Sequence, residues 1–215
     1  EGQGAPAGEE LLLDGDALGE GKAYFSLGGV SHGNDHRFLA YGIDDAGSEL
    51  YTIRIRDTQS GKDLADTIAN TTSGSVWSAD GQWLFYVRLD DNHRPSRVFR
   101  HRLGSDGAED VLVYEEQDPA FFVGIGETQD RRFIVIDVHE HQTSEVHLID
   151  ASAPATAPRL PLARADGPEP RVEPPAAELL IPPPPPPDAF RPSSPPPHPA
   201  RPRHCPAGLP HHPAR

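Results

Sequence analysis

The chain has 215 residues and a formal net charge of −14 at pH 7, a length that fits one domain or two small ones. Residues 1–150 contain 28 acidic and 12 basic residues, whereas residues 151–215 contain 5 and 7. Nucleic acid is excluded as an expected partner, because binding to phosphates requires clustered Lys and Arg. No apolar run approaches the roughly 20 residues that span a bilayer, and no signal peptide opens the sequence, so we expect a cytoplasmic location.

The first predicted elements are three β-strands. Residues 1–8 are expected to be flexible, and the folded part is expected to begin at residue 9. A Gly-rich apolar strand is predicted over 23–30 ("AYFSLGGV"), and a second strand over 35–42 ("DHRFLAYG"). In the third, 51–57 ("YTIRIRD"), apolar and polar residues alternate, which is typical of a half-buried antiparallel strand.

The same order of segments returns twice further along the chain. The second segment of each unit, called the Asp phrase below, starts with an aspartate, at Asp35, Asp80 and Asp130. These positions give a period of 45 to 50 residues. An outer strand is also predicted in the second unit, at 110–116 ("DVLVYEE"). The repeated segments are "GSVWS" (74–78), "DGQWLFYV" (80–87) and "RVFRHR" (97–102), then "AFFVGIG" (120–126), "DRRFIVID" (130–137) and "EVHLID" (145–150).

Four strands per unit at this period are typical of the blades of a β-propeller. We therefore predict an all-β fold, a partial β-propeller with about three four-stranded blades around 23–70, 74–116 and 120–150. The Gly-rich strand of each unit fits the innermost position, and the Asp of each phrase fits a tight turn where its carboxylate accepts backbone N–H groups. The alternative is three unrelated hairpins of a β-sandwich. The matching offsets between the units favour the propeller.

The sequence of residues 9–152 resembles the N-terminal propeller of the prolyl oligopeptidase family of serine peptidases. The segments "LLLDGDALGEGKAYFSLGGVS", "SGSVWSADGQWLFYVR" and "RRFIVIDVHEHQTSEVHLID" are most similar to the oligopeptidase B branch. The resemblance implies a seven-bladed propeller that caps an α/β-hydrolase domain in the full enzyme and restricts access to short peptides. It also implies cleavage after Lys or Arg by a Ser-Asp-His triad.

No catalytic residue is assigned to this chain. We expect it to lack both the triad and the Gly-x-Ser-x-Gly nucleophile elbow, and therefore to be inactive alone. We also expect no cofactor and no metal ion. The hydrolase domain is the implied intramolecular partner, and short basic peptides are expected partners only in the context of the full enzyme.

Residues 153–215 are predicted to be a disordered tail rich in Pro, Arg and His. Of the 25 prolines, 22 lie between Pro154 and Pro213, and six in a row favour polyproline II. The composition favours a frame-shifted translation of a GC-rich gene. The alternative is a genuine proline-rich linker or SH3-type ligand, in which case the chain is an interaction module with a recruiting tail.

A few side chains qualify as candidate site residues, each with a plainer explanation beside it. His139 and His141 lie two apart on a predicted strand, as metal ligands can, but a solvated strand explains them as well. The acidic groups could steer basic peptides or could simply be soluble loop residues. Phe121 and Phe122 are expected to pack between blades. The acidic groups are Asp44-Asp45, Asp90-Asp91 and Glu115-Glu116-Asp118.

Overall fold

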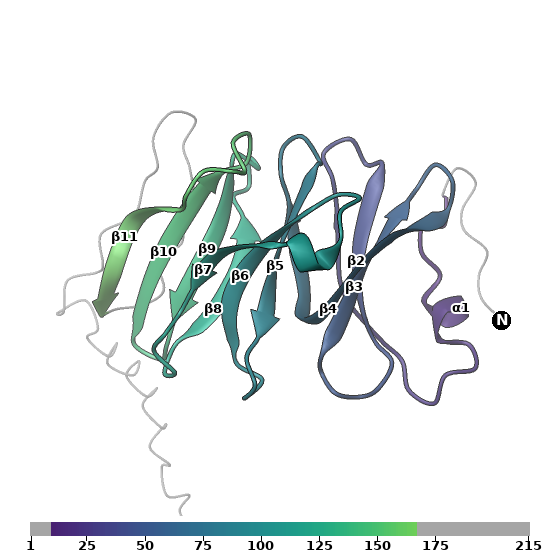
Figure 1. Cartoon of the computed structure of the whole chain (residues 1–215), viewed down its shortest axis with the longest axis horizontal. Helices are drawn as coiled ribbons and strands as arrows, with labels where there is room; N and C mark the ends of the chain where they lie inside the picture. The colour runs from purple at the N-terminus through teal and green to yellow at the C-terminus, as the bar shows by residue number, and fades with distance from the viewer. Residues whose placement is uncertain (1–9, 167–215) are drawn as a thin grey trace, which may run out of the picture. The chain divides into compact units, whose positions relative to one another are not determined.

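The computed structural model describes residues 10–166, and this part of the chain is almost entirely β-structure (Figure 1). One short helix, α1 (Gly15–Gly19), precedes the strands, and the Asp14 carboxylate caps it by accepting the Ala17 N–H at 3.0 Å. None of the described helices is long and apolar enough to cross a membrane. The stretch 1–8, and residues 167–215 of the expected tail, lie outside the described residues.

The first seven strands form one continuous antiparallel sheet in chain order. A single turn of 3-10 helix, η1 (Gly107–Glu109), precedes the last of them. The strands are β1 (Ser26–His32), β2 (Phe38–Asp44), β3 (Tyr51–Asp57), β4 (Lys62–Trp77), β5 (Trp83–Leu89), β6 (Pro95–Arg102) and β7 (Val111–Glu115).

Strand β4 belongs to two blades. Its first part pairs with β3, and its last residues, from Ser75 to Trp77, pair with β5. The register shifts between Thr71 and Ser75, where Asn70 and Ser73 have positive φ angles of 61° and 77°. Such angles are uncommon outside Gly and bend the strand. The outer strand of the first blade therefore continues directly into the inner strand of the second.

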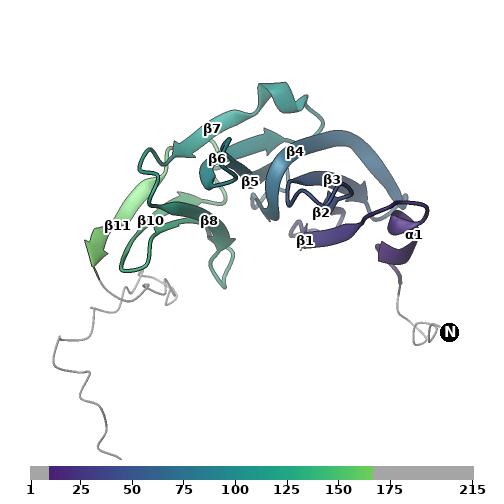
Figure 2. The same cartoon turned by 90° about the horizontal axis from the view of Figure 1, so that it is seen from below.

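The third blade is a separate four-stranded sheet, with neighbours in the order β11-β10-β9-β8. Its strands are β8 (Phe122–Glu127), β9 (Phe133–His139), β10 (Thr143–Asp150) and β11 (Arg159–Asp166). Figure 2 shows the three blades following one another in chain order. The expected all-β, four-stranded blades are confirmed.

Strand β11 corrects the expected boundary between the propeller and the tail at residue 152. It completes the third blade by pairing with β10, with Val146 opposite Leu162 and Leu148 opposite Arg159. Pro161 lies within β11, and the many prolines in this part of the sequence had favoured a disordered tail. A proline is tolerated here because β11 is the edge of its sheet, where a missing N–H interrupts no ladder on the outer side.

The apolar core lies between the blades, in two layers. The layer between blades one and two includes Ile53 and Ile55 of β3, the residues that alternate toward the inside of "YTIRIRD". The layer between blades two and three includes Phe121, which is only 6% exposed. Phe122 is 46% exposed, so the expectation that both phenylalanines pack between blades is wrong for Phe122. Consecutive strand residues point to opposite faces.

The repeated Asp phrase forms the same turn in all three blades. The carboxylates of Asp35, Asp80 and Asp130 each accept a hydrogen bond from the backbone N–H two residues ahead, at 3.0 to 3.1 Å. The residue after each Asp has a positive φ between 57° and 66° and bonds back to the carbonyl three residues earlier. This is a type I turn followed by a left-handed residue, a common hairpin connection. The role predicted for the Asp is confirmed.

Candidate functional site

Each junction between neighbouring blades contains a cluster of charged side chains contributed by both blades. We call the contact of blades one and two the first junction, and that of blades two and three the second junction. The His101 cluster lies at the first junction and consists of Asp66, Tyr86, Arg88, His101 and Asp110. The Arg164 cluster lies at the second junction and consists of Tyr114, Glu116, Glu145, His147 and Arg164.

His101, on β6, is the centre of the first cluster and has no exposed surface. Its Nε2 lies 2.8 Å from Oδ1 of Asp66 on β4, and its Nδ1 lies 2.7 Å from Oδ1 of Asp110, just after η1. Strand alternation places His101 on the same face as Phe99, which packs against the core of the first junction. Because Asp66 belongs to blade one, the His101–Asp66 contact joins the two blades.

The two contacts fix the protonation state of His101. A ring nitrogen bonds to a carboxylate only as a donor, so contacts on both sides require a proton on each nitrogen. Burial lowers the pKa of His101, but the hydrogen bonds and negative charges of Asp110 and Asp66 outweigh it and raise the pKa above the ordinary 6.5. The geometry of the first junction therefore favours an imidazolium at His101, between Asp66 and Asp110.

Further polar contacts hold the His101 cluster together. The Tyr86 hydroxyl donates to Oδ2 of Asp110 at 2.6 Å, and the Arg88 guanidinium lies 3.9 Å from the same oxygen. The Gly104 N–H donates to Oδ1 of Asp66 at 2.6 Å. Burial, followed by the hydrogen bond to Asp110, raises the pKa of Tyr86 well above its usual range, so its hydroxyl stays protonated.

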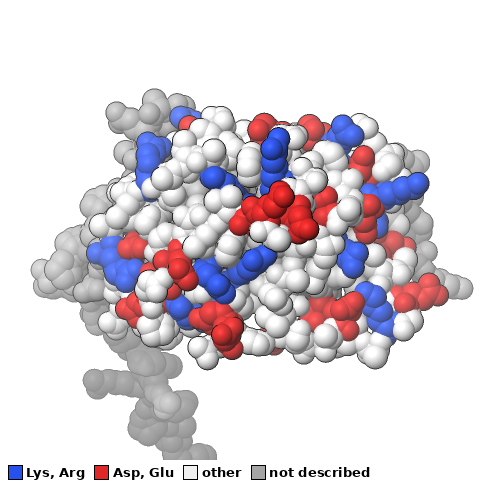
Figure 3. Space-filling model, viewed as in Figure 1, with Lys and Arg blue, Asp and Glu red and all other residues white. Residues whose placement is uncertain are grey.

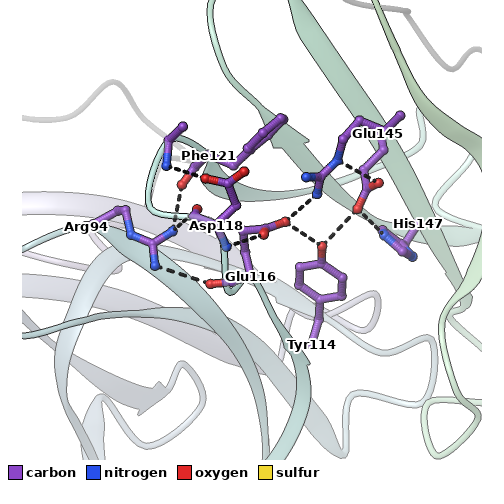
Figure 4. Close-up of polar contacts among 9 residues, drawn as sticks. Arg94, Tyr114, Glu116, Asp118, Phe121, Glu145 and His147 are labelled. Atoms are coloured by element: carbon purple, nitrogen blue, oxygen red, sulfur yellow. Dashed lines mark hydrogen bonds and ion pairs between the residues drawn. The ribbon is translucent and has the colours of Figure 1, made fainter.

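The Arg164 cluster crosses the second junction from the edge strand β11. Figure 4 shows its members Glu116, Tyr114, Glu145 and His147 joined in a chain of polar contacts. Arg164 donates to Oε2 of Glu116 at 2.6 Å and to Oε2 of Glu145 at 3.3 Å, and Glu116 belongs to blade two while Glu145 belongs to blade three. The Tyr114 hydroxyl lies within hydrogen-bond distance of both carboxylates, 3.1 Å from Glu116 and 2.9 Å from Glu145. His147 Nε2 lies 3.0 Å from Oε1 of Glu145, the oxygen that the Tyr114 hydroxyl also contacts.

Ionisation of Glu145 is stabilised by its partners. Burial opposes the charge, but the hydrogen bonds from His147, Arg164 and Tyr114 outweigh it and lower the pKa of Glu145 below the ordinary 4.5. The Arg164 guanidinium also lies 3.9 Å from the centre of the Phe121 ring, a cation–π contact. Arg164 is 35% exposed, so this cluster is wetter than the one around His101.

Arg94, in the turn between β5 and β6, fixes the chain that passes from blade two to blade three. Its guanidinium bonds to Asp90 at 3.0 Å and donates to the carbonyls of Asp118, Phe121 and Glu116 at 2.8 to 3.2 Å. Figure 4 shows Arg94 beside this connection. One side chain of blade two thus determines where blade three begins.

The acidic groups mostly stabilise turns. Asp44 is 2% exposed and accepts the N–H groups of Ala46, Gly47 and Glu49, and Asp90 is bonded to Arg94. The backbone hydrogen bonds lower the pKa of Asp44 despite its partial desolvation. Acidic and basic side chains are interspersed on the face in Figure 3, with no field of a single sign. Asp91 remains exposed.

The expectation that the chain lacks Gly-x-Ser-x-Gly is wrong as a statement about sequence, because Gly29-Val30-Ser31-His32-Gly33 matches it. The structure shows that the match is not a nucleophile elbow. An elbow needs a serine on a sharp turn from strand to helix, whereas Ser31 lies inside β1 of a hairpin. Its hydroxyl pairs with the hydroxyl of Ser75 at 2.7 Å. Ser31 has no general base among its hydrogen-bond partners in residues 10–166.

The two histidines considered as metal ligands are not brought together on one strand. His139 is the last residue of β9 and contacts Asp137 at 3.0 Å, whereas His141 lies in the following turn. Across the described range, no group of three or more His, Cys, Asp or Glu side chains could hold a metal ion. The His- and Cys-containing part of the tail lies outside that range.

The comparisons with known proteins agree with this architecture. The family model for "Prolyl oligopeptidase, N-terminal beta-propeller domain" matches residues 1–173. The fold and the matched residues define the class as the propeller domain of serine peptidases. The chain belongs to the prolyl oligopeptidase family, as part of its N-terminal β-propeller.

Several relatives refine this placement. The chain is 44% identical to dipeptidyl aminopeptidase BI of Pseudoxanthomonas mexicana, covering 69% of this chain and 21% of that protein. It is 37% identical to protease 2 of Moraxella lacunata, covering 75% and 24%. Oligopeptidase B from Leishmania major matches with a TM-score of 0.73 and 29% identity over 79% of this chain and 25% of that one. The chain thus spans about a quarter of its relatives' length.

Proposed function

We propose that this chain is part of the substrate-gating propeller of an oligopeptidase B-like serine peptidase that cleaves short peptides after Lys or Arg. The observation that carries the proposal is the series of three blades joined by two interlocked junctions, in a chain that is similar to dipeptidyl aminopeptidase BI and protease 2. In this reading the blades admit short peptides and exclude folded or long ones. The hydrolase domain is the partner that supplies the catalytic groups.

A gate of this kind requires blades that do not separate. The His101–Asp66 contact ties blade one to blade two, and Arg164 ties blade two to blade three. Exposed apolar side chains on or beside β1, namely Tyr24, Leu27 and Val30, support the proposal that a further blade packs there. The stand-alone interaction module is less well supported, because none of these features requires a recruiting tail.

A chimera tests the gate directly. Residues 10–166 would replace the matching segment of dipeptidyl aminopeptidase BI, the 44% identical relative, and the unaltered relative would serve as the control. We expect the chimera to cleave a fluorogenic dipeptide substrate of the relative and to leave peptides of several tens of residues intact. Cleavage of long and short peptides at similar rates would contradict the gating role.

The chain by itself is expected to be catalytically silent. Purified protein would be assayed on a fluorogenic dipeptide with Arg before the scissile bond, because the proposed specificity is for basic residues. We expect no turnover above the rate in buffer, and a Ser31→Ala variant should behave identically. Turnover that is lost in that variant would show that the hairpin serine is a nucleophile after all and would overturn the assignment of catalysis to the hydrolase domain.

A further inference from the structure

An open groove of about 720 Å³ lies where β4 of blade one meets the end of the β5–β6 hairpin of blade two. Two arginines line it, Arg88 on β5 and Arg97 on β6. They are direct partners in the antiparallel register, so their side chains lie on the same face of the sheet. Two like charges in that position repel each other, which makes the groove a place where a negative charge is stabilised.

The balance of charge around the arginines is incomplete. Asp66 and Asp110 balance His101 and Arg88 in the His101 cluster. Arg97 makes no ion pair with any carboxylate in the described part of the chain. One of its Nη groups donates to the Leu89 carbonyl at 3.1 Å, and its Nε is buried without a hydrogen-bond partner. Of His101, Arg88 and Arg97, only Arg97 therefore lacks a carboxylate partner within residues 10–166.

The rim of the groove carries the opposite charge. Asp90 and Asp106 are engaged, Asp90 with Arg94 and Asp106 with the N–H of Ala108. Asp91 is exposed and makes no hydrogen bond or ion pair with a described residue. A multiply charged anion would be repelled by this rim, whereas a ligand with a carboxylate and a positive group would satisfy both parts of the groove.

We propose that this groove binds the C-terminus of a short peptide ending in Lys or Arg, with its carboxylate on Arg97 and Arg88 and its basic side chain toward Asp91. A guanidinium is suited to the task because its planar fork donates two parallel hydrogen bonds to a carboxylate. The choice of ligand rests on the proposed function, since such peptides are the products of cleavage after a basic residue. The groove would retain or sense product on the propeller.

The test is a calorimetric titration of the 215-residue chain with the dipeptide Gly-Arg. Gly-Arg amide lacks the carboxylate, and inorganic phosphate carries negative charge without a positive group. We expect Gly-Arg to bind, and both other ligands to bind roughly tenfold or more weakly, which is the usual effect of losing a charge-assisted hydrogen bond. Equal affinity for the amide, or for phosphate, would overturn the proposal.

Variants locate the site. Arg97→Gln should weaken Gly-Arg binding roughly tenfold or more, whereas Arg102→Gln, an exposed arginine on the same strand that stacks on Trp83, should leave it unchanged. Circular dichroism would verify folding. If Arg97→Gln unfolds, Arg97→Lys retains the charge without the fork and should still bind more weakly. Unchanged binding in a folded Arg97 variant would overturn the site.

The proposal and the gating function fail separately. If the chimera cleaves long peptides but the chain binds Gly-Arg through Arg97, then the gate is wrong and the groove stands. If the chimera excludes long peptides but Gly-Arg does not bind, then the groove is wrong and the gate stands.

Discussion

The two junctions join similar blades by different means. At the first, the charges are sealed from water, with His101 fully buried between Asp66 and Asp110. At the second, Arg164 reaches across from an edge strand and is 35% exposed. Breaking a buried ion pair costs much free energy, because the charge that remains has neither its partner nor water to stabilise it. At an exposed ion pair, water takes the place of the lost partner. Substitutions at the first junction should therefore reduce the stability of the fold more than substitutions at the second.

Removing the buried imidazolium should have the largest effect. His101→Ala removes the cation that lies between two buried aspartates and leaves Asp66 with only the Gly104 N–H among the contacts described above. We expect the free energy of unfolding to fall by about 3–5 kcal/mol. Urea denaturation followed by circular dichroism measures the change. His141→Ala, at an exposed turn histidine, is the matched control and should alter stability little. A loss below about 1 kcal/mol for His101→Ala would show that the two junctions do not differ as described.

Alkaline pH should weaken the first junction next. Because the pKa of His101 is raised by folding, its stabilising contribution is complete below the ordinary value of 6.5 and is lost as pH rises through the folded value. Comparing wild type with His101→Ala between pH 6 and 9 isolates this group, since other titrations are common to both proteins. The difference in stability should shrink as pH rises, and a constant difference would contradict a charged His101.

The exposed junction should tolerate substitution better. Arg164→Gln removes two ion pairs and the contact with Phe121, yet we expect a loss of only about 1 kcal/mol, because solvent screens a side chain that is one-third exposed. Arg159→Gln, on the same strand and stacked on Phe133, is the control. A loss for Arg164→Gln as large as that for His101→Ala would remove the distinction between the junctions.

Acid should produce the smallest effect, and at the second junction. Folding lowers the pKa of Glu145, so its contribution is present above the ordinary 4.5 and is lost as pH falls through the folded value. The difference in stability between wild type and Arg164→Gln should therefore decline in acid. A difference that persists unchanged at the lowest pH where the protein stays folded would mean that Arg164 acts through Phe121 rather than through its ion pairs with Glu116 and Glu145.

Short-range features of this fold could be predicted from sequence, and contacts between blades could not. The phrases beginning at Asp35, Asp80 and Asp130 predict both the repeat and the turn, because a carboxylate that bonds two residues ahead is a local interaction. Asp66 and His101 are 35 residues apart, and Arg164 and Glu116 are 48 apart. Those pairs meet only once whole blades stack, and nothing in the local sequence specifies which faces come together.

Local patterns also misled in two places. The prolines around Arg159–Asp166 suggested a tail, yet the segment forms an edge strand where proline is tolerated. The motif Gly-x-Ser-x-Gly was expected to be absent, yet it occurs around Ser31, where it lies in a hairpin and forms no nucleophile elbow. One sequence cue for the His101 cluster was present and overlooked. In "RVFRHR", His101 lies two residues after Phe99 and therefore on the same face of the strand, and that face packs against the core.

The claim that neighbouring blades are locked together through buried charge is tested most directly by a double-mutant cycle between Asp66 and His101. Stability would be measured for Asp66→Ala, His101→Ala and the double variant. We predict that the two single losses do not add, and that the coupling between the residues exceeds about 1 kcal/mol, as for groups in one network. Losses that add within about 0.3 kcal/mol would mean that blade one and blade two do not meet at this pair.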